Sequence, residues 1–156
     1  IGFGMPKYTF VDAMENAPHL LAPTGSNMYE NPPGTVMAGC HQDLNFLTVH
    51  GKSNVPGLFV WYGDGTRHAV SVPPGCLLLQ AGMQMEYLTG GDIPAGFHEV
   101  VAPPDPKHEW RISSTLFSHV NCTLQPLEPF PENDKFPPIH SADFVSDQLK
   151  AISLAA

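Results

Sequence analysis

The chain has 156 residues, with 7 lysines and arginines against 15 aspartates and glutamates, and a formal net charge of −8. A chain of this length folds as one domain that buries roughly 68–70% of its unfolded surface. The acidic balance, without any basic cluster, argues against binding to nucleic acid or to an anionic membrane, because both need neutralising cations. We therefore expect a small-molecule substrate, and nothing in the sequence indicates an oligomeric state.

Cysteine usage and the lack of long apolar runs bear on the compartment. The three cysteines, at positions 40, 76 and 122, show no CxxC or zinc-finger spacing, so the sequence predicts neither a disulfide framework nor a structural zinc site. No apolar run approaches the roughly 18 residues of a membrane span, and the first residues do not resemble a signal peptide. We expect a cytoplasmic protein. Because the chain opens with IGFGMPK, without an initiator methionine, we expect residues 1–156 to be a single domain of a longer protein with a preceding N-terminal part.

Prolines and glycines divide the chain into short segments. Seventeen prolines and fourteen glycines leave little room for long helices. Residues 8–16 are predicted to form a helix that Pro18 ends. After it we expect short strands bounded by turn residues, in the runs HLLA, TVMAGCH, NFLTVH, GLFVWY, HAVSV, CLLLQA, MEYL, FHEVVA and RISSTLFSHV. This spacing is typical of a β-sandwich or barrel.

Further signals mark a hairpin, the predicted core and the C-terminal end. The stretch GLFVWYGDGTRHAVSV predicts a hairpin that turns at positions 63–65, and the apolar runs CLLLQ and LFVW are predicted to be core. Residues 125–138 are predicted to form a proline-rich connection on the surface. Ser141 is predicted to cap a final helix, which packs on the sheet through Val145, Leu149 and Ile152.

An imidazole and a carboxylate stand two residues apart at the start of HQDLNFLTVHG, residues 41–51. Alternate residues of a strand share a face, so His41 and Asp43 are expected on the same side. Such a pair indicates a metal site, and His98, at the head of the run FHEVVA, is our candidate for the third ligand. Two histidines and one carboxylate form the facial triad of non-haem Fe(II) sites. Catalytic zinc sites use similar ligands, so these residues alone leave the metal open.

A second pair of polar residues follows the same alternation in RISS, residues 111–114. Arg111 and Ser113 would both point into the cavity that holds the metal ligands. Arginine binds a carboxylate through two parallel hydrogen bonds, and serine adds a third donor. A dicarboxylate that meets the metal at one end and Arg111 at the other would explain both pairs, whereas the plainer alternative for Arg111 is an ion pair with a nearby Asp or Glu.

Four segments in this order resemble one known family, over roughly residues 35–117. HQDLNFLTVH is similar to the family's H-T-D-x-x-x-L-T stretch, and PGLFVW is similar to its PGLQV strand. VPPGCLLLQAG is similar to its P-x-P-G-x-x-x-x-N-x-G segment, and RISSTLF is similar to R-x-S with a trailing aromatic residue. The chain therefore resembles the Fe(II)/2-oxoglutarate-dependent oxygenases of the isopenicillin N synthase-like superfamily.

This resemblance implies a mainly β fold, the double-stranded β-helix or jelly roll, with a short N-terminal helix and a C-terminal helix. It implies that iron is bound by His41, Asp43 and His98, and that Arg111 and Ser113 bind the distal carboxylate of 2-oxoglutarate. The implied reaction uses O2 and decarboxylates 2-oxoglutarate to succinate while a small organic substrate is hydroxylated, desaturated or cyclised. Ascorbate is an optional reductant. The substrate itself is not encoded in a recognisable motif.

The sequence departs from the family pattern in places, and it leaves two competing interpretations. Glu99 follows His98 where the family usually has arginine, and Gln80 replaces the asparagine of the family's N-x-G-D segment. A 2-oxoglutarate-independent iron oxidase of the same superfamily and a non-catalytic jelly-roll binding module remain alternatives. We expect Cys40 to be buried on the strand face opposite His41. The five other histidines after position 41 are expected at the surface or at strand ends, namely His50, His68, His108, His119 and His140.

Overall fold

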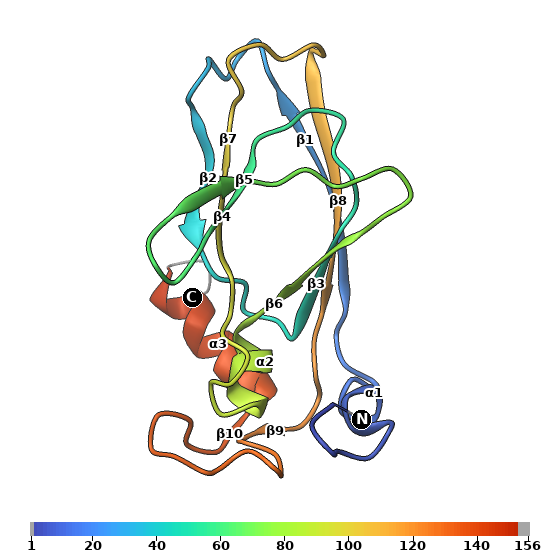
Figure 1. The fold of residues 1–156 in the computed structure, drawn as a ribbon, viewed down its shortest axis with the longest axis vertical. Helices are drawn as coiled ribbons and strands as arrows, with labels where there is room; N and C mark the ends of the chain where they lie inside the picture. Colours follow the sequence, from blue (N-terminus) through green and yellow to red (C-terminus); the bar gives the residue numbers. More distant parts are fainter. Residues whose placement is uncertain (1, 153–156) are drawn as a thin grey trace.

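The computed structural model describes residues 2–152, and its body is a pair of four-stranded antiparallel sheets that face one another (Figure 1). The major sheet has the order β1 (Leu20–Asn27), β8 (Trp110–Ser118), β3 (Leu47–His50) and β6 (Leu78–Ala81). The minor sheet has the order β2 (Val36–His41), β7 (Phe97–Val101), β4 (Leu58–Trp61) and β5 (Arg67–Ala69). Two sheets of this order form a jelly roll, which confirms the predicted fold.

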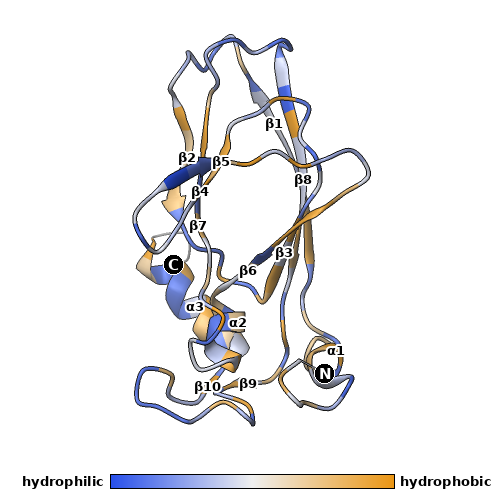
Figure 2. Ribbon diagram, viewed as in Figure 1, coloured by the Kyte–Doolittle hydropathy of each residue, from blue (hydrophilic) through white to orange (hydrophobic). Residues whose placement is uncertain are grey.

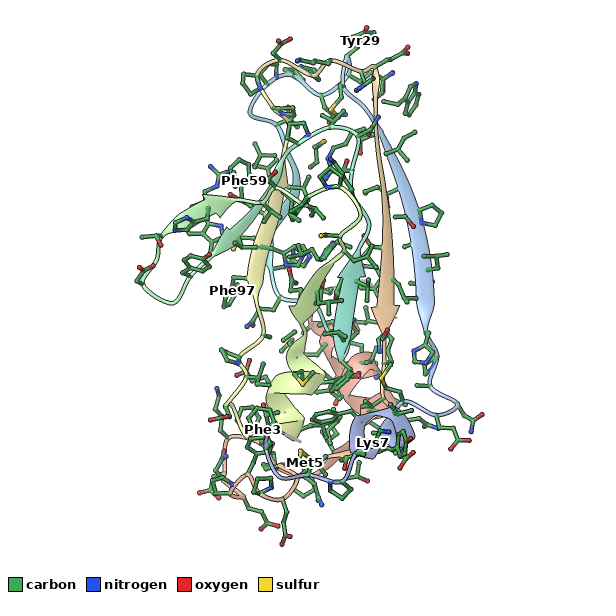
Figure 3. The ribbon with its side chains drawn as sticks, turned by 45° about the vertical axis from the view of Figure 1, so that its right-hand side comes forward. Phe3, Met5, Lys7, Tyr29, Phe59 and Phe97 are labelled. Atoms are coloured by element: carbon green, nitrogen blue, oxygen red, sulfur yellow. The ribbon has the colours of Figure 1, made fainter. Side chains whose placement is uncertain are left out.

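The helices gather at one end of the sandwich, with a small second pair of strands (Figure 1). They are α1 (Thr9–Ala13), α2 (Met83–Leu88) and α3 (Ser141–Ala151), and the strands are β9 (Thr123–Leu124) and β10 (Ile139–His140). We call this region the packed end, because it holds the cluster of buried apolar side chains Phe46, Leu88, Val120, Leu124 and Phe144. Figure 3 shows Phe3 and Met5 at this end and Tyr29 at the opposite one.

The predicted strand MEYL is wrong, because these residues lie in α2. Gln84 and Leu88 are four residues apart and both are buried, a spacing that brings them to one face of a helix. The tertiary contacts of that face, rather than a local strand propensity, determine the conformation. The predicted N-terminal helix is present but shorter, since α1 spans only Thr9–Ala13.

The C-terminal helix is present with a different cap, and its packed face includes Val145, as predicted, together with Phe144. The N-cap is His140, whose Nδ1 accepts a hydrogen bond from the backbone N–H of Ala142 at 3.2 Å. Ser141 is instead the first helical residue and is buried with Phe144, whereas Ile152 is 56% exposed. Phe144 and Val145 lie three and four residues after Ser141 on the same face, so the aromatic ring packs beside the predicted aliphatic position.

The predicted core is wrong for the run CLLLQ, because the outer face of the major sheet is apolar but exposed. Leu77 and Leu79 are exposed, Leu79 by 61%, and Ile112 on β8 is exposed as well. Figure 2 shows the apolar stretch along β3 and the segment that leads into β6. The β4–β5 hairpin forms as predicted. Within residues 2–152, no helix has the length and apolarity needed to cross a membrane.

Candidate metal and carboxylate site

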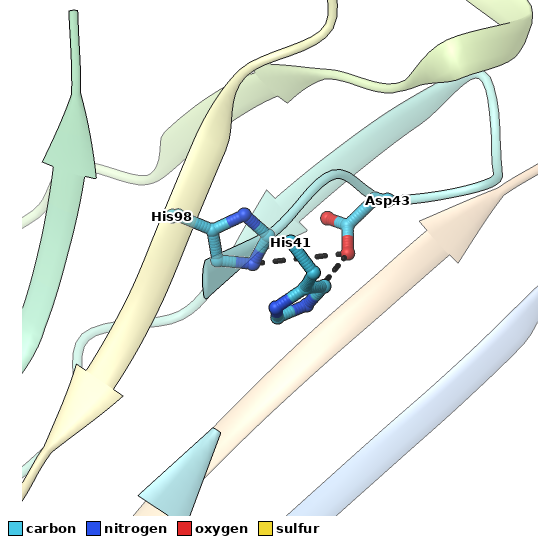
Figure 4. A group of neighbouring side chains, drawn as sticks. All are labelled: His41, Asp43 and His98. Atoms are coloured by element: carbon cyan, nitrogen blue, oxygen red, sulfur yellow. Dashed lines mark ion pairs between the residues drawn. The ribbon is translucent and has the colours of Figure 1, made fainter. Parts of the chain in front are cut away.

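The three predicted metal ligands converge at one place between the sheets (Figure 4). His41 ends β2 and is paired in register with His98 of β7, while Asp43 lies in the loop after β2. Nε2 of His41 is 3.6 Å and Nε2 of His98 is 3.7 Å from Oδ1 of Asp43. One ligand atom from each residue lies within 4.8 Å of the others. The expectation that His41 and Asp43 share one strand face is wrong, because the strand ends between them and the loop brings the carboxylate in.

The Asp43 carboxylate is buried, with 6% exposure, and is held by neighbouring donors on its other oxygen. Oδ2 accepts hydrogen bonds from Thr48 Oγ1 at 2.6 Å and from Gln80 Nε2 at 3.1 Å. Burial alone would raise the pKa of Asp43, but the hydrogen bonds from His41 and Thr48 outweigh it and lower the pKa below its ordinary value. Oδ1 therefore faces the two imidazoles as an ionised oxygen.

The backbone around Asp43 is fixed by the start of α2. The N–H of Met83 donates to the carbonyl of Asp43 at 2.8 Å, and the N–H of Gln84 donates to the carbonyl of Asn45 at 3.1 Å. A Cβ at Gly82 would collide with the Asn45 carbonyl. Only glycine allows this close approach, so the chain can hold the loop that carries Asp43 against the packed end.

The two imidazoles differ in environment. His41 Nδ1 is 2.6 Å from the Gly39 carbonyl and donates to it, so Nε2 carries a lone pair in the neutral ring and donates to Asp43 only when the ring is protonated. The hydrogen bond with Asp43 raises the pKa of His41, against the lowering effect of burial. Burial is the largest influence on His98 and lowers its pKa. Both Nε2 atoms face the carboxylate, so the donor set of two imidazoles and one carboxylate fits a divalent metal.

Gln80, which the family pattern marked only as a departure, is part of the site. Its Nε2 lies 3.1 Å from Asp43 Oδ2 and 3.0 Å from His98 Nδ1, so one amide contacts two of the three proposed ligands. Partners of this kind orient metal ligands. The substitution of glutamine for asparagine was visible in the sequence, but its two contacts depend on the pairing of β6 with β3.

Arg111 and Ser113 both face the interior from β8, as predicted, and Arg111 Nη1 is 3.5 Å from Ser113 Oγ. Arg111 is only 7% exposed, and its Nε is buried without a hydrogen-bond partner among the described residues. Burial lowers the pKa of Arg111. No carboxylate of residues 2–152 forms an ion pair with it, so the plainer alternative from the sequence is wrong. A buried guanidinium without a counter-ion fits a bound anion.

A cavity of about 420 Å³ joins the two groups. The triad and the Arg111–Ser113 pair both line it, together with backbone and side chains of the segment 50–58. Cavities of this size are typical of small-molecule sites. The site can therefore hold a metal ion and an anionic small molecule in one cavity.

The remaining histidines, Cys40 and Glu99 differ in where they lie relative to the cavity. His50 ends β3, but it lines the cavity rather than the surface, while His68, His108, His119 and His140 lie outside it. Cys40 is exposed, so the prediction that it is buried is wrong, because β2 has one open face. Glu99, the residue after His98, pairs with Arg67 at 2.6 Å on the outer face of the minor sheet.

Comparison with known proteins bears directly on this site. The family model described as the 2OG-Fe(II) oxygenase superfamily matches residues 21–120. The chain belongs to the 2OG-Fe(II) oxygenase superfamily. The matched range includes all three metal-ligand candidates and the Arg111–Ser113 pair, so the resemblance inferred from the sequence motifs is confirmed at the level of the superfamily.

Individual relatives extend this result to sequence and fold. The chain is 33% identical over 103 residues to the alpha-ketoglutarate dependent kainoid synthase of Digenea simplex, covering 59% of this chain and 28% of that protein. A full-length Neurospora crassa protein, solved in complex with alpha-KG, superimposes with a TM-score of 0.81 at 20% identity, over 97% of this chain and 50% of that one. The rice dioxygenase for auxin oxidation gives a TM-score of 0.71 at 18% identity, over 92% and 50%. The chain thus spans about half the length of these solved structures and less of the curated relative.

Proposed function

We propose that this oxygenase-superfamily chain acts as an Fe(II)- and 2-oxoglutarate-dependent dioxygenase on a small organic substrate. The observation that carries the proposal is the shared cavity, in which three clustered ligands face one end and a buried, unpaired arginine lies along the wall of the described structure. In this proposal His41, Asp43 and His98 hold the iron, and Arg111 and Ser113 bind the distal carboxylate of 2-oxoglutarate.

When bound, iron and 2-oxoglutarate supply the activation of O2, with oxidative decarboxylation to succinate, for attack on a substrate C–H bond. The residues of the chain contribute binding and orientation. Asp43 stays ionised through its hydrogen bonds to His41 and Thr48, and Gln80 fixes the carboxylate and the His98 ring. Arg111 supplies a buried positive charge that binds the cosubstrate end-on.

Finer assignments are part of the same proposal. We place the chain in the isopenicillin N synthase-like branch, on the four motifs of the sequence, and we treat residues 1–156 as one oxygenase domain. Hydroxylation, desaturation and ring closure are all open to such a site, and ascorbate would act only as a reductant. A cytoplasmic location is supported by the three cysteines, which are free in the described structure, and the net charge of −8 argues against a nucleic-acid partner.

An anaerobic titration tests the proposal. Fe(II) is added to the metal-free protein, followed by 2-oxoglutarate, and the visible charge-transfer band of the metal-bound keto acid is recorded. We expect a band that requires both additions. Arg111→Ala should weaken 2-oxoglutarate binding by roughly 100-fold, because it removes a charge-assisted pair, while the Fe(II) affinity stays unchanged. Arg67→Ala is the matched control, since that arginine pairs with Glu99 outside the cavity.

The same titration, followed by admission of O2 and measurement of its uptake, separates the competing functions. Iron binding without a 2-oxoglutarate band would favour an oxidase that takes its electrons from the substrate. Stoichiometric metal binding with no effect of either keto acid or O2 would favour a binding module. Equal loss of iron and 2-oxoglutarate in Arg111→Ala would contradict the division of roles between the triad and the arginine.

A further inference from the structure

His50 is a cavity residue that neither the proposed metal set nor the Arg111–Ser113 pair uses. We propose that its imidazole donates a hydrogen bond to a carboxylate oxygen of bound 2-oxoglutarate, as a third protein group that fixes the cosubstrate. The inference rests on the proposed function, because it assigns a further residue to the same site. It would make His50 a determinant of cosubstrate affinity rather than of metal affinity.

The strand register places His50 between the two proposed binding groups. Thr48 is opposite Phe117 and His50 is opposite Thr115 on neighbouring strands of the major sheet. Thr48 holds Asp43 at 2.6 Å. On β8, the inward-facing residues after Thr115 in the same direction are Ser113 and Arg111, because alternate residues share a face. An acid that extends from the metal ligands toward Arg111 therefore passes the level of His50.

One nitrogen of the imidazole has no partner in this position. Nε2 of His50 is buried and makes no hydrogen bond with the described residues, and the same is true of Nε of Arg111. Both residues line the one cavity. Buried polar groups are nearly always paired in native structures, so two cavity residues that each keep an unpaired nitrogen indicate a site completed by a ligand. A carboxylate has only acceptors and can take a hydrogen bond from the imidazole and from the guanidinium.

Two nearby groups offer alternatives for His50. Its ring meets the His98 ring edge-on, with centroids 5.9 Å apart and planes at 76°, and the compact ligand cluster consists of His41, Asp43 and His98 without it. The Gln80 amide lies near enough to influence the pKa of His50, but Gln80 Oε1 and His50 Nε2 are both left without a hydrogen-bond partner among the described residues.

The test measures 2-oxoglutarate and Fe(II) affinities separately in the full-length protein, from the charge-transfer band and from an anaerobic iron titration. His50→Leu should weaken 2-oxoglutarate binding by about 10- to 100-fold, as expected for the loss of a hydrogen bond to a charged acceptor. His50→Gln keeps an N–H donor at similar reach and should recover most of the affinity. Fe(II) affinity should change by less than about twofold. His68→Leu, on the outer strand β5, is the control.

A second readout follows the hydrogen bond itself. With Zn(II) as a diamagnetic metal, the 15N-labelled ring N–H signal of His50 should shift downfield when 2-oxoglutarate is added and should not shift with acetate. Unchanged 2-oxoglutarate affinity in His50→Leu overturns the proposal, and so does a Gln variant no better than the Leu variant. If Fe(II) affinity falls together with 2-oxoglutarate affinity, or falls alone, then His50 binds the metal or supports Gln80. Either result also overturns the proposal. If the wild type binds iron but no 2-oxoglutarate, the proposed function fails and this inference fails with it.

Discussion

The packed end, formed by the helices and the β9–β10 pair, and the cavity between the two four-stranded sheets are filled in opposite ways. The packed end closes with apolar side chains such as Phe46, Leu88 and Phe144. The cavity interior instead carries Asp43, His98 and Arg111, all buried. Buried charge is unfavourable unless it is paired or binds a ligand, so the cavity lowers the stability that the packed end supplies. This division separates the residues that hold the fold from those that hold ligands.

Asp43→Ala should produce the largest effect and confine it to the cavity. The variant removes the only carboxylate from the cluster of three ligands, and we expect Fe(II) affinity to fall by more than about 1000-fold. The melting temperature of the metal-free protein should change by only a few degrees. Isothermal titration with Fe(II) under nitrogen measures the affinity. Asp64→Ala, in the exposed β4–β5 turn, is the control, and near-normal binding by Asp43→Ala would refute the ligand assignment.

Leu88→Ala should have the opposite effect, lowering the stability that the packed end provides without altering the cavity. The side chain is fully buried, so a cavity remains and the free energy of unfolding should fall by about 2–5 kcal/mol. Urea denaturation of the 156-residue chain measures the loss. Leu79→Ala removes the same atoms from an exposed position and should change stability by less than about 0.5 kcal/mol. Similar losses in the two variants would show that the packed end is not the stabilising region.

Gln80→Leu tests whether the cavity depends on residues behind the ligands. The change keeps the approximate volume but removes the donor to Asp43 and the contact with His98. We expect Fe(II) affinity to fall by about 10- to 100-fold, as is usual for partners of metal ligands. Gln42→Leu is the control, because that amide binds the Ala95 carbonyl instead. An unchanged affinity would mean that the backbone bonds from α2 alone position Asp43.

The pH dependence of metal binding should be the mildest effect. His41 has a raised pKa, so below that pKa a proton competes with the metal for Nε2. The pKa values of Asp43 and His98 are both lowered, so neither residue releases a proton when the metal binds near neutral pH. Affinity should therefore rise by about tenfold per pH unit from acid toward neutral pH and level off above the His41 pKa. A slope near two protons, measured in anaerobic titrations between about pH 5.5 and 8, would contradict this picture.

Much of the site could be predicted because its residues lie in short local motifs. HQD, the histidine of FHEVVA and RIS each contain the residue types that their chemistry requires, and their order matches the superfamily. The positions that failed are those set by partners distant in sequence. MEYL became helical through the burial of Gln84 and Leu88, and Leu77 and Leu79 of CLLLQ face outward although they are apolar. Asp43 reaches the histidines from a loop rather than from a strand face.

The sequence by itself determined the family, the jelly roll and the identity of the candidate ligands, because ligand chemistry and short-range alternation leave direct marks on residue type. Only the tertiary structure decided that Gln80 contacts both Asp43 and His98, and that Arg111 has no counter-ion within the described chain. It also decided that His50 lies along the sheet between the level of Asp43 and that of Arg111. These relations join residues far apart in the sequence through sheet register, and register depends on the packing of both faces rather than on any one segment.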